Sequence, residues 1–141
     1  GEKADEQLAW LDEKLGESTA RWKIAVLHHA PYSSSAKRGS NVELRAAVEP
    51  LFVEHGVQLA LTGHDHTYER TTPQNGVTYV VTGAGAKLSD VGRSDFTAAS
   101  AEILQFLMIE VDGNRLNLRA IDKTGAVFDE VTLNASGEVV P

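Results

Sequence analysis

Two short apolar segments separated by one amphipathic stretch restrict the fold more than any other feature of this sequence. Residues 22–27 and 57–62 have the length and the side chains of β-strands. Between them, apolar residues at helical spacing predict a helix over residues 41–55, which Asn41 caps and Gly56 ends. A strand, helix and strand in this order form a right-handed crossover with parallel strands. We therefore predict an α/β fold in which the two strands are neighbours.

The remaining segments divide the chain near residue 100. Residues 1–16 predict a leading helix, and residues 22–100 hold the strand–helix–strand unit together with a third strand at 77–82. Residues 101–134 predict three strands joined by two short turns that contain glycine. Short hairpin connections require antiparallel pairing. The predicted domain therefore has parallel strands followed by antiparallel ones.

Three local expectations follow from the same pattern. The apolar run 22–27 predicts a buried strand. Pro50 lies inside the predicted helix and is expected to kink it or divide it in two. The tail at 134–141 has no periodic pattern and is expected to be loose.

Composition excludes several classes of function. A formal charge of −7 disfavours nucleic acid or an anionic membrane as partner, because either would be repelled. The chain has no cysteine, so disulfides and thiolate chemistry are excluded. Its first residues are polar and acidic, lack a methionine and open directly into a helix. We expect a segment of a longer protein, without its own targeting sequence.

Four of the five histidines directly follow the two predicted strands. Ligands of open α/β sheets bind beyond the carboxyl ends of the strands, so His29, His64 and His66 are expected to converge there. Alternate residues of an extended segment point to the same side, and imidazole binds zinc, iron, copper and nickel. Asp65 is a candidate to bind the same metal or to orient the histidines. Solvated strand-end histidines are the alternative that the residues alone leave open.

Two motifs resemble a known family. The segments V-L-H-H-A-P-Y at 26–32 and G-H-D-H-T-Y-E-R at 63–70 resemble those of calcineurin-like metallophosphoesterases of the purple acid phosphatase type. The glycine loop at 83–85 and the helix segment Q-L-A-W-L at 7–11 are also similar, so that the resemblance covers most of residues 5–90. It implies a partial four-layer sandwich, with residues 1–141 as the carboxy-terminal half of the domain.

The resemblance also implies a set of metal ligands. His29 and His64 would bind one metal and His66 another, whereas His28 occupies a variable position and would not be a ligand. The complete enzyme would hold two ions, of iron, zinc or manganese. Three upstream segments supply the other ligands of the family: an aspartate at a strand end, G-D-x-x-Y or G-D-x-x-D, and G-N-H-D/E. None occurs here, so we expect at most one ion to bind well.

The predicted substrate loop departs from the family pattern. Related enzymes often carry a histidine after the serine cluster, but here residues 33–35 lead into Lys37 and Arg38. Either basic side chain is a candidate to hold a phosphate oxygen, and a solvated loop is the alternative. We interpret Glu69 and Arg70 as structural residues.

The function implied by the resemblance is metal-dependent hydrolysis of a phosphorylated small molecule, in a secreted or periplasmic protein. The isolated chain is expected to be weakly active or inactive, because it lacks the shared carboxylate. Its expected partner is the upstream half of the same protein, or a second copy of the chain. The alternative is a non-catalytic metal-binding or interaction module that retains the fold.

Overall fold

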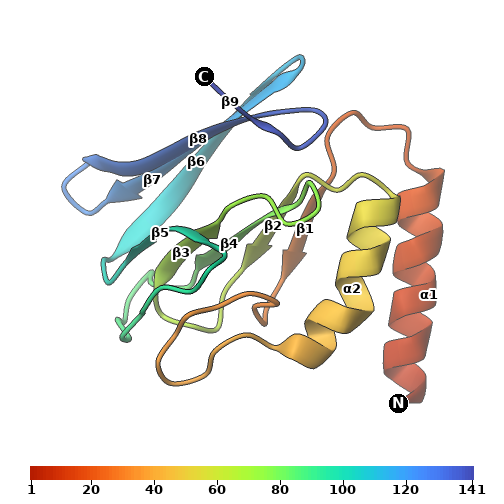
Figure 1. Ribbon diagram of the computed structural model, residues 1–141, viewed down its shortest axis with the longest axis horizontal. Coiled ribbons are helices and arrows are strands. Elements are labelled where there is room, and N and C mark those ends of the chain that lie inside the picture. The colour runs from red at the N-terminus through yellow and green to blue at the C-terminus, as the bar shows by residue number, and fades with distance from the viewer.

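The computed structural model describes residues 1–141 and shows three layers (Figure 1). Helices α1 (Glu2–Glu17) and α2 (Val42–Glu54) cover one face of a five-stranded sheet, and a four-stranded sheet packs on its other face. The first sheet contains β1 (Ile24–Leu27), β2 (Leu59–Thr62), β3 (Tyr68–Thr71), β4 (Thr78–Thr82) and β5 (Thr97–Ala101). The second contains β6 (Gln105–Asp112), β7 (Arg115–Asp122), β8 (Val127–Asn134) and β9 (Val139–Val140). The predicted α/β architecture is confirmed.

The first sheet has the strand order β1-β2-β4-β3-β5. Strands β1, β2 and β4 are parallel, with Ile24 opposite Leu59 and Leu59 opposite Thr78. The predicted crossover is therefore present, with α2 as its helix. Strands β3 and β5 add an antiparallel extension that the sequence pattern did not reveal. Strand β3 escaped prediction because it buries a charged residue, Glu69, where an apolar one is expected.

The second sheet has the order β6-β7-β8-β9 and is antiparallel throughout, as predicted. Gly113 and Gly125 adopt positive φ angles in the two predicted hairpin turns, which explains the glycines there. The tail is not loose as expected. A turn closed by the Asn134 amide and the Glu138 carbonyl brings β9 back onto β8.

Each parallel strand contributes to two apolar layers, because successive side chains point to opposite faces. Leu59 is fully buried between the two sheets, whereas its neighbour Ala60 is buried under the helices. Leu8, Leu11 and Leu15 of α1 pack against the helix-side layer. The leading helix is thus present as predicted, and these leucines face the core.

The expectation that the first strand is buried is wrong. Ala25 and Leu27 pack on the helix side, but Ile24 and Val26 are 40% and 79% exposed. They lie on the opposite face of β1, which is an edge strand of the sheet. The second sheet leaves this edge uncovered.

Helix α2 continues through Pro50 as one element, so the proline does not divide it in two. Its ends are fixed as predicted: the Asn41 side chain accepts a hydrogen bond from the Leu44 amide at 3.0 Å, and Gly56 has a φ of 68°. Phe52 is 1% exposed, so packing offsets the hydrogen bond that proline cannot donate.

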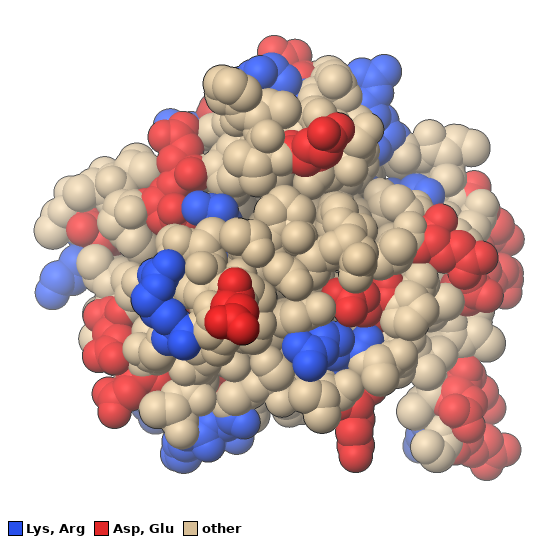
Figure 2. Space-filling view, viewed as in Figure 1, with Lys and Arg blue, Asp and Glu red and all other residues tan.

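Charge is distributed unevenly over the surface. Acidic side chains gather at the right of the view in Figure 2, where α1 lies, and elsewhere on this face acidic and basic residues are mixed. Neither helix has the length and apolar composition needed to cross a membrane.

Candidate metal centre

Three histidines meet at the carboxyl ends of β1 and β2. His28 and His29 directly follow β1, and His64 follows β2 after one glycine. The ring centroids are 4.9 Å apart for His28–His29 and for His28–His64, and 4.5 Å apart for His29–His64. One ligand nitrogen from each ring lies within 4.8 Å of the other two. The parallel pairing of the strands thus builds a three-imidazole cluster.

The backbone around His64 differs from the expected extended segment. His64 has a φ of 65°, a left-handed conformation that is uncommon outside glycine. The Asp65 amide donates to the Gly63 carbonyl at 2.7 Å, and the Gly63 amide donates to the His28 carbonyl at 3.0 Å. These bonds fix a tight bend, so the alternation argument for His64 and His66 does not hold.

The structure brings together two of the three predicted ligands. His29 and His64 belong to the cluster, together with His28, whereas His66 lies outside it. The His66 carbonyl instead accepts a hydrogen bond from the Ser89 amide at 2.9 Å. The motif position of His28 predicts no ligand role. Its place at a strand end beside His29 is the sequence signal for its position in the cluster.

His64 favours the neutral form that a metal ligand requires. Desolvation, the charge of Arg38 and the neighbouring imidazoles lower the pKa of His64 below its ordinary value. Neutral imidazole nitrogens suit zinc, iron and related metals. The donor set therefore fits one such ion, but it contains no carboxylate to hold a second ion beside it.

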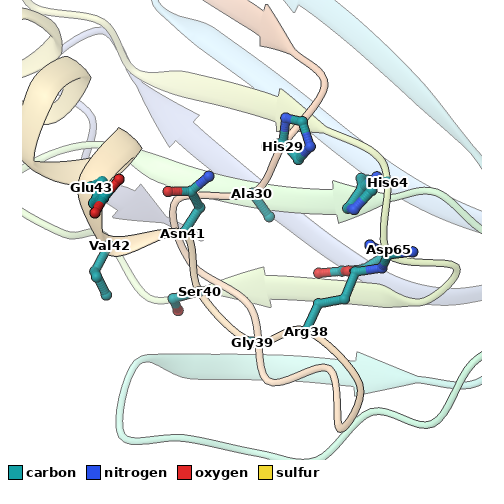
Figure 3. A pocket seen from close by; sticks show the side chains of 10 residues that line it. All are labelled: His29, Ala30, Arg38, Gly39, Ser40, Asn41, Val42, Glu43, His64 and Asp65. Atoms are coloured by element: carbon teal, nitrogen blue, oxygen red, sulfur yellow. The ribbon is translucent and has the colours of Figure 1, made fainter.

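A pocket of 460 Å³ opens beside His29 and His64. Figure 3 shows that Arg38 extends across it toward Asp65, while the first residues of α2 form the opposite wall. The lining residues are His29, Ala30, Arg38, Gly39, Ser40, Asn41, Val42, Glu43, His64 and Asp65. Of the two predicted phosphate-holding residues, Arg38 lines the pocket and the exposed Lys37 does not.

Asp65 joins the serine loop to the histidine loop. Its side chain is 2% exposed, and its Oδ2 accepts a hydrogen bond from Ser33 Oγ at 2.6 Å. Its Oδ1 has no hydrogen-bond partner and lies 3.9 Å from Arg38 Nε. A buried carboxylate oxygen without a partner attracts the nearby guanidinium. Asp65 is thus placed to orient Arg38.

The glycine loop after β4 supports the same bend. A side chain at Gly83 would overlap the Asp65 carbonyl oxygen and lie 3.0 Å from its carbon. Glycine is needed here because the two loops meet backbone to backbone.

Glu69 and Arg70 have the structural roles expected of them. Glu69 is 1% exposed and accepts hydrogen bonds from the Ser34 amide and from Thr97 Oγ1. Arg70 donates two hydrogen bonds to Asp129 of the second sheet, at 2.8 and 3.0 Å. One residue fixes the serine loop and the other joins the two sheets.

A second group of possible ligands lies at the opposite end of the sheet. Asp12, Glu54 and His55 gather where α1 and α2 end, and His55 Nε2 is 2.6 Å from Asp12 Oδ1. The contact between His55 and Asp12 links the two helices, and this structural role explains why these side chains lie together.

Comparisons with known proteins agree with the fold and with the motifs. Residues 1–68 match the calcineurin-like phosphoesterase family. The chain is 39% identical over 84 residues to tartrate-resistant acid phosphatase type 5 of Oryctolagus cuniculus, covering 60% of this chain and 26% of that protein. It is 37% identical over 78 residues to purple acid phosphatase 17 of Arabidopsis thaliana, covering 55% of this chain and 23% of that protein.

The fold is similar to that of a purple acid phosphatase from yellow lupin (Lupinus luteus) seeds. The TM-score is 0.83 at 24% sequence identity, over 92% of this chain and 28% of that one. The chain thus spans about a quarter of the length of the curated relatives it matches. By these similarities residues 1–68 resemble the calcineurin-like phosphoesterase family, and the chain is similar in sequence to acid phosphatases of the purple acid phosphatase type.

Proposed function

We propose that this chain supplies the histidine-bearing part of a metal-dependent phosphate-ester hydrolase. The observation that carries the proposal is the convergence of His29 and His64 at neighbouring strand ends beside Arg38. Its relatives include acid phosphatases, which supports hydrolysis of a phosphate ester as the reaction class.

The metal ligands form one part of the proposal. His29 and His64 hold one ion, and His66 serves a second ion in an enzyme that also contains the upstream ligands. Bound ions of this kind activate a water molecule and stabilise charge on the phosphoryl oxygens. Metal binding is proton-linked, since the imidazoles must be neutral. The metals are iron, zinc or manganese, and this chain alone holds at most one ion.

Arg38 is proposed to recognise the substrate. Its guanidinium carries two positions for paired hydrogen bonds to phosphate, and Asp65 holds it over the pocket. The start of α2 forms the opposite wall, and the positive end of a helix dipole favours an anion there. A volume of 460 Å³ suits a phosphorylated small molecule. Lys37 is the weaker candidate, because it lies outside the lining.

The partner in this proposal is the upstream half of the same protein. An apolar groove of 580 Å³ lies between α1, β1 and α2, and it continues onto the exposed edge of β1. Unpaired strand edges with apolar side chains favour addition of another strand or of a second copy. We also propose a secreted or periplasmic location, which cell fractionation would test.

A non-catalytic module is the second candidate, favoured by the absence of a carboxylate from the three-histidine cluster. Hydrolysis of an aryl phosphate with zinc or manganese separates the two functions. The chain is assayed alone and after addition of a separate chain that carries the three upstream motif segments. Activity that appears on mixing and is abolished by Arg38→Ala supports the enzyme. Inactivity of a mixture that forms a stable complex supports the module.

A further inference from the structure

His28 contacts His64 directly, although the family motif gives it no ligand role. His28 Nε2 lies 3.0 Å from His64 Nδ1. Two nitrogens that share a tetrahedral zinc ion, each at about 2.0–2.1 Å, are roughly 3.3 Å apart. The separation in the structure is therefore already close to the one that a shared ion needs.

The orientation of the three rings supports the same interpretation. The ring planes make angles of 82°, 71° and 56° with one another, so no two rings are stacked. The nitrogens lie within 4.8 Å of each other, and small rotations about the side-chain bonds bring all three to one ion.

The backbone holds His28 and His64 in place. The Gly63 amide donates to the His28 carbonyl, which fixes the strand end to the loop after β2. His64 keeps a left-handed φ of 65°, a conformation that persists only where its surroundings impose it. Such strain is typical of residues that are held for function.

We propose that His28 is the third imidazole ligand of the ion bound by His29 and His64. The inference rests on the proposed metal site and changes its composition. This chain would form a mononuclear three-histidine site, with a fourth position open toward solvent or substrate. Both His28 and His29 are exposed, so the ion has free access from solvent.

The alternative role for His28 is to orient His64 through a hydrogen bond. Removing a residue that only orients a ligand costs about 10- to 100-fold in metal affinity. A lost ligand is expected to cost more than about 100-fold. The variants His28→Ala and His28→Gln separate the roles, because glutamine retains a hydrogen-bonding side chain but is no substitute for imidazole.

Long-range ¹H–¹⁵N NMR of the imidazoles during titration with Zn²⁺ tests the inference on the intact chain. We expect one ring nitrogen of each of His28, His29 and His64 to acquire the shift of a metal-bound nitrogen. Calorimetry should show that both His28 variants lose more than about 100-fold in affinity. Asp112→Asn, at an exposed position of the second sheet, is the control and should bind as the wild type does.

Two other outcomes would overturn the inference. If only His29 and His64 change, or if His28→Gln restores the affinity, His28 is not a ligand and the proposed site stands without it. If none of the three changes, the inference and the proposed metal site are both overturned.

Discussion

Gly83 shows how one residue without a side chain shapes the site. Its backbone lies against the carbonyl of Asp65. Asp65 stands between His64 and His66 in the sequence, and its side chain faces Arg38. We predict that Gly83→Ala pushes this loop away. Stability should fall by about 1–3 kcal/mol, as in other overpacked positions. Zinc affinity should fall about 10- to 100-fold, because the loop that positions His64 is displaced.

The control for this variant is Gly85→Ala in the same loop. A side chain at Gly85 would meet no atom within 4 Å. The stability of Gly85→Ala in thermal unfolding and its zinc affinity in calorimetry should therefore be close to those of the wild type. Equal effects of the two substitutions would contradict the account of Gly83.

The sequence predicted the roles of single residues correctly where those roles depend only on neighbouring residues in the chain. Asn41 and Gly56 end a helix through their own hydrogen bond or backbone angle, so neither needs tertiary information. The bend at His64 depends on hydrogen bonds to Gly63 and from that glycine to a neighbouring strand end. The sequence alone does not contain that contact, which is why the place of His28 beside His64 was not predicted.

A polar contact joins the two sheets in addition to their apolar packing. Asp129 of β8 accepts hydrogen bonds from Arg70 and from the Tyr68 hydroxyl. Burial alone would raise the pKa of Asp129, but the hydrogen bonds from Arg70 and Tyr68 outweigh it and hold that pKa below its ordinary value. The ionised form is therefore stabilised by folding.

We predict that Asp129→Asn costs about 3 kcal/mol at neutral pH, because it leaves the largely buried Arg70 side chain without its charged partner. A carboxyl with a lowered pKa stabilises the fold above its unfolded value of about 3.9, and this contribution is lost as the pH falls through the folded value. The stability of the wild type should therefore decline more steeply below about pH 5 than that of the variant.

Urea unfolding between about pH 2 and pH 7 measures this difference. Asp112→Asn is a suitable control, since Asp112 is an exposed residue of the same sheet. Parallel pH profiles for the wild type and Asp129→Asn would refute the proposed role of the ion pair.

Among the elements, those with apolar periodicity were predicted and those without it were missed. Strands β1, β2 and β4 and the three long strands of the second sheet were identified from their apolar runs and turn residues. Strands β3 and β5 were missed because their sequences, Y-E-R-T and T-A-A-S-A, are polar or small. Their pairing is held by tertiary hydrogen bonds, such as that between Thr97 and Glu69.

The molecule as a whole leaves one edge of its first sheet open. Val26 is 79% exposed on β1, next to the apolar groove bounded by α1 and α2. We predict that the isolated chain self-associates through this edge. Val26→Lys should shift it toward the monomer at little cost in stability, since a charged residue on an edge strand opposes pairing.

Sedimentation velocity over a range of concentrations measures the association. Val53→Lys, on an exposed position of α2 outside the groove, is the matched control. Self-association that is unaffected by Val26→Lys, or a wild type that stays monomeric at all concentrations, would show that this edge does not mediate contact between copies.

Calorimetric titration with zinc tests the central claim that the strand-end histidines form a metal centre. The wild-type chain should bind about one ion, and His64→Ala should lose more than about 100-fold in affinity, because His64 belongs to the three-imidazole cluster. The circular dichroism spectrum of His64→Ala should match the wild type, so that lost binding is not lost folding. The account is contradicted if the wild type binds no zinc, or if a folded His64→Ala variant binds it as tightly as the wild type.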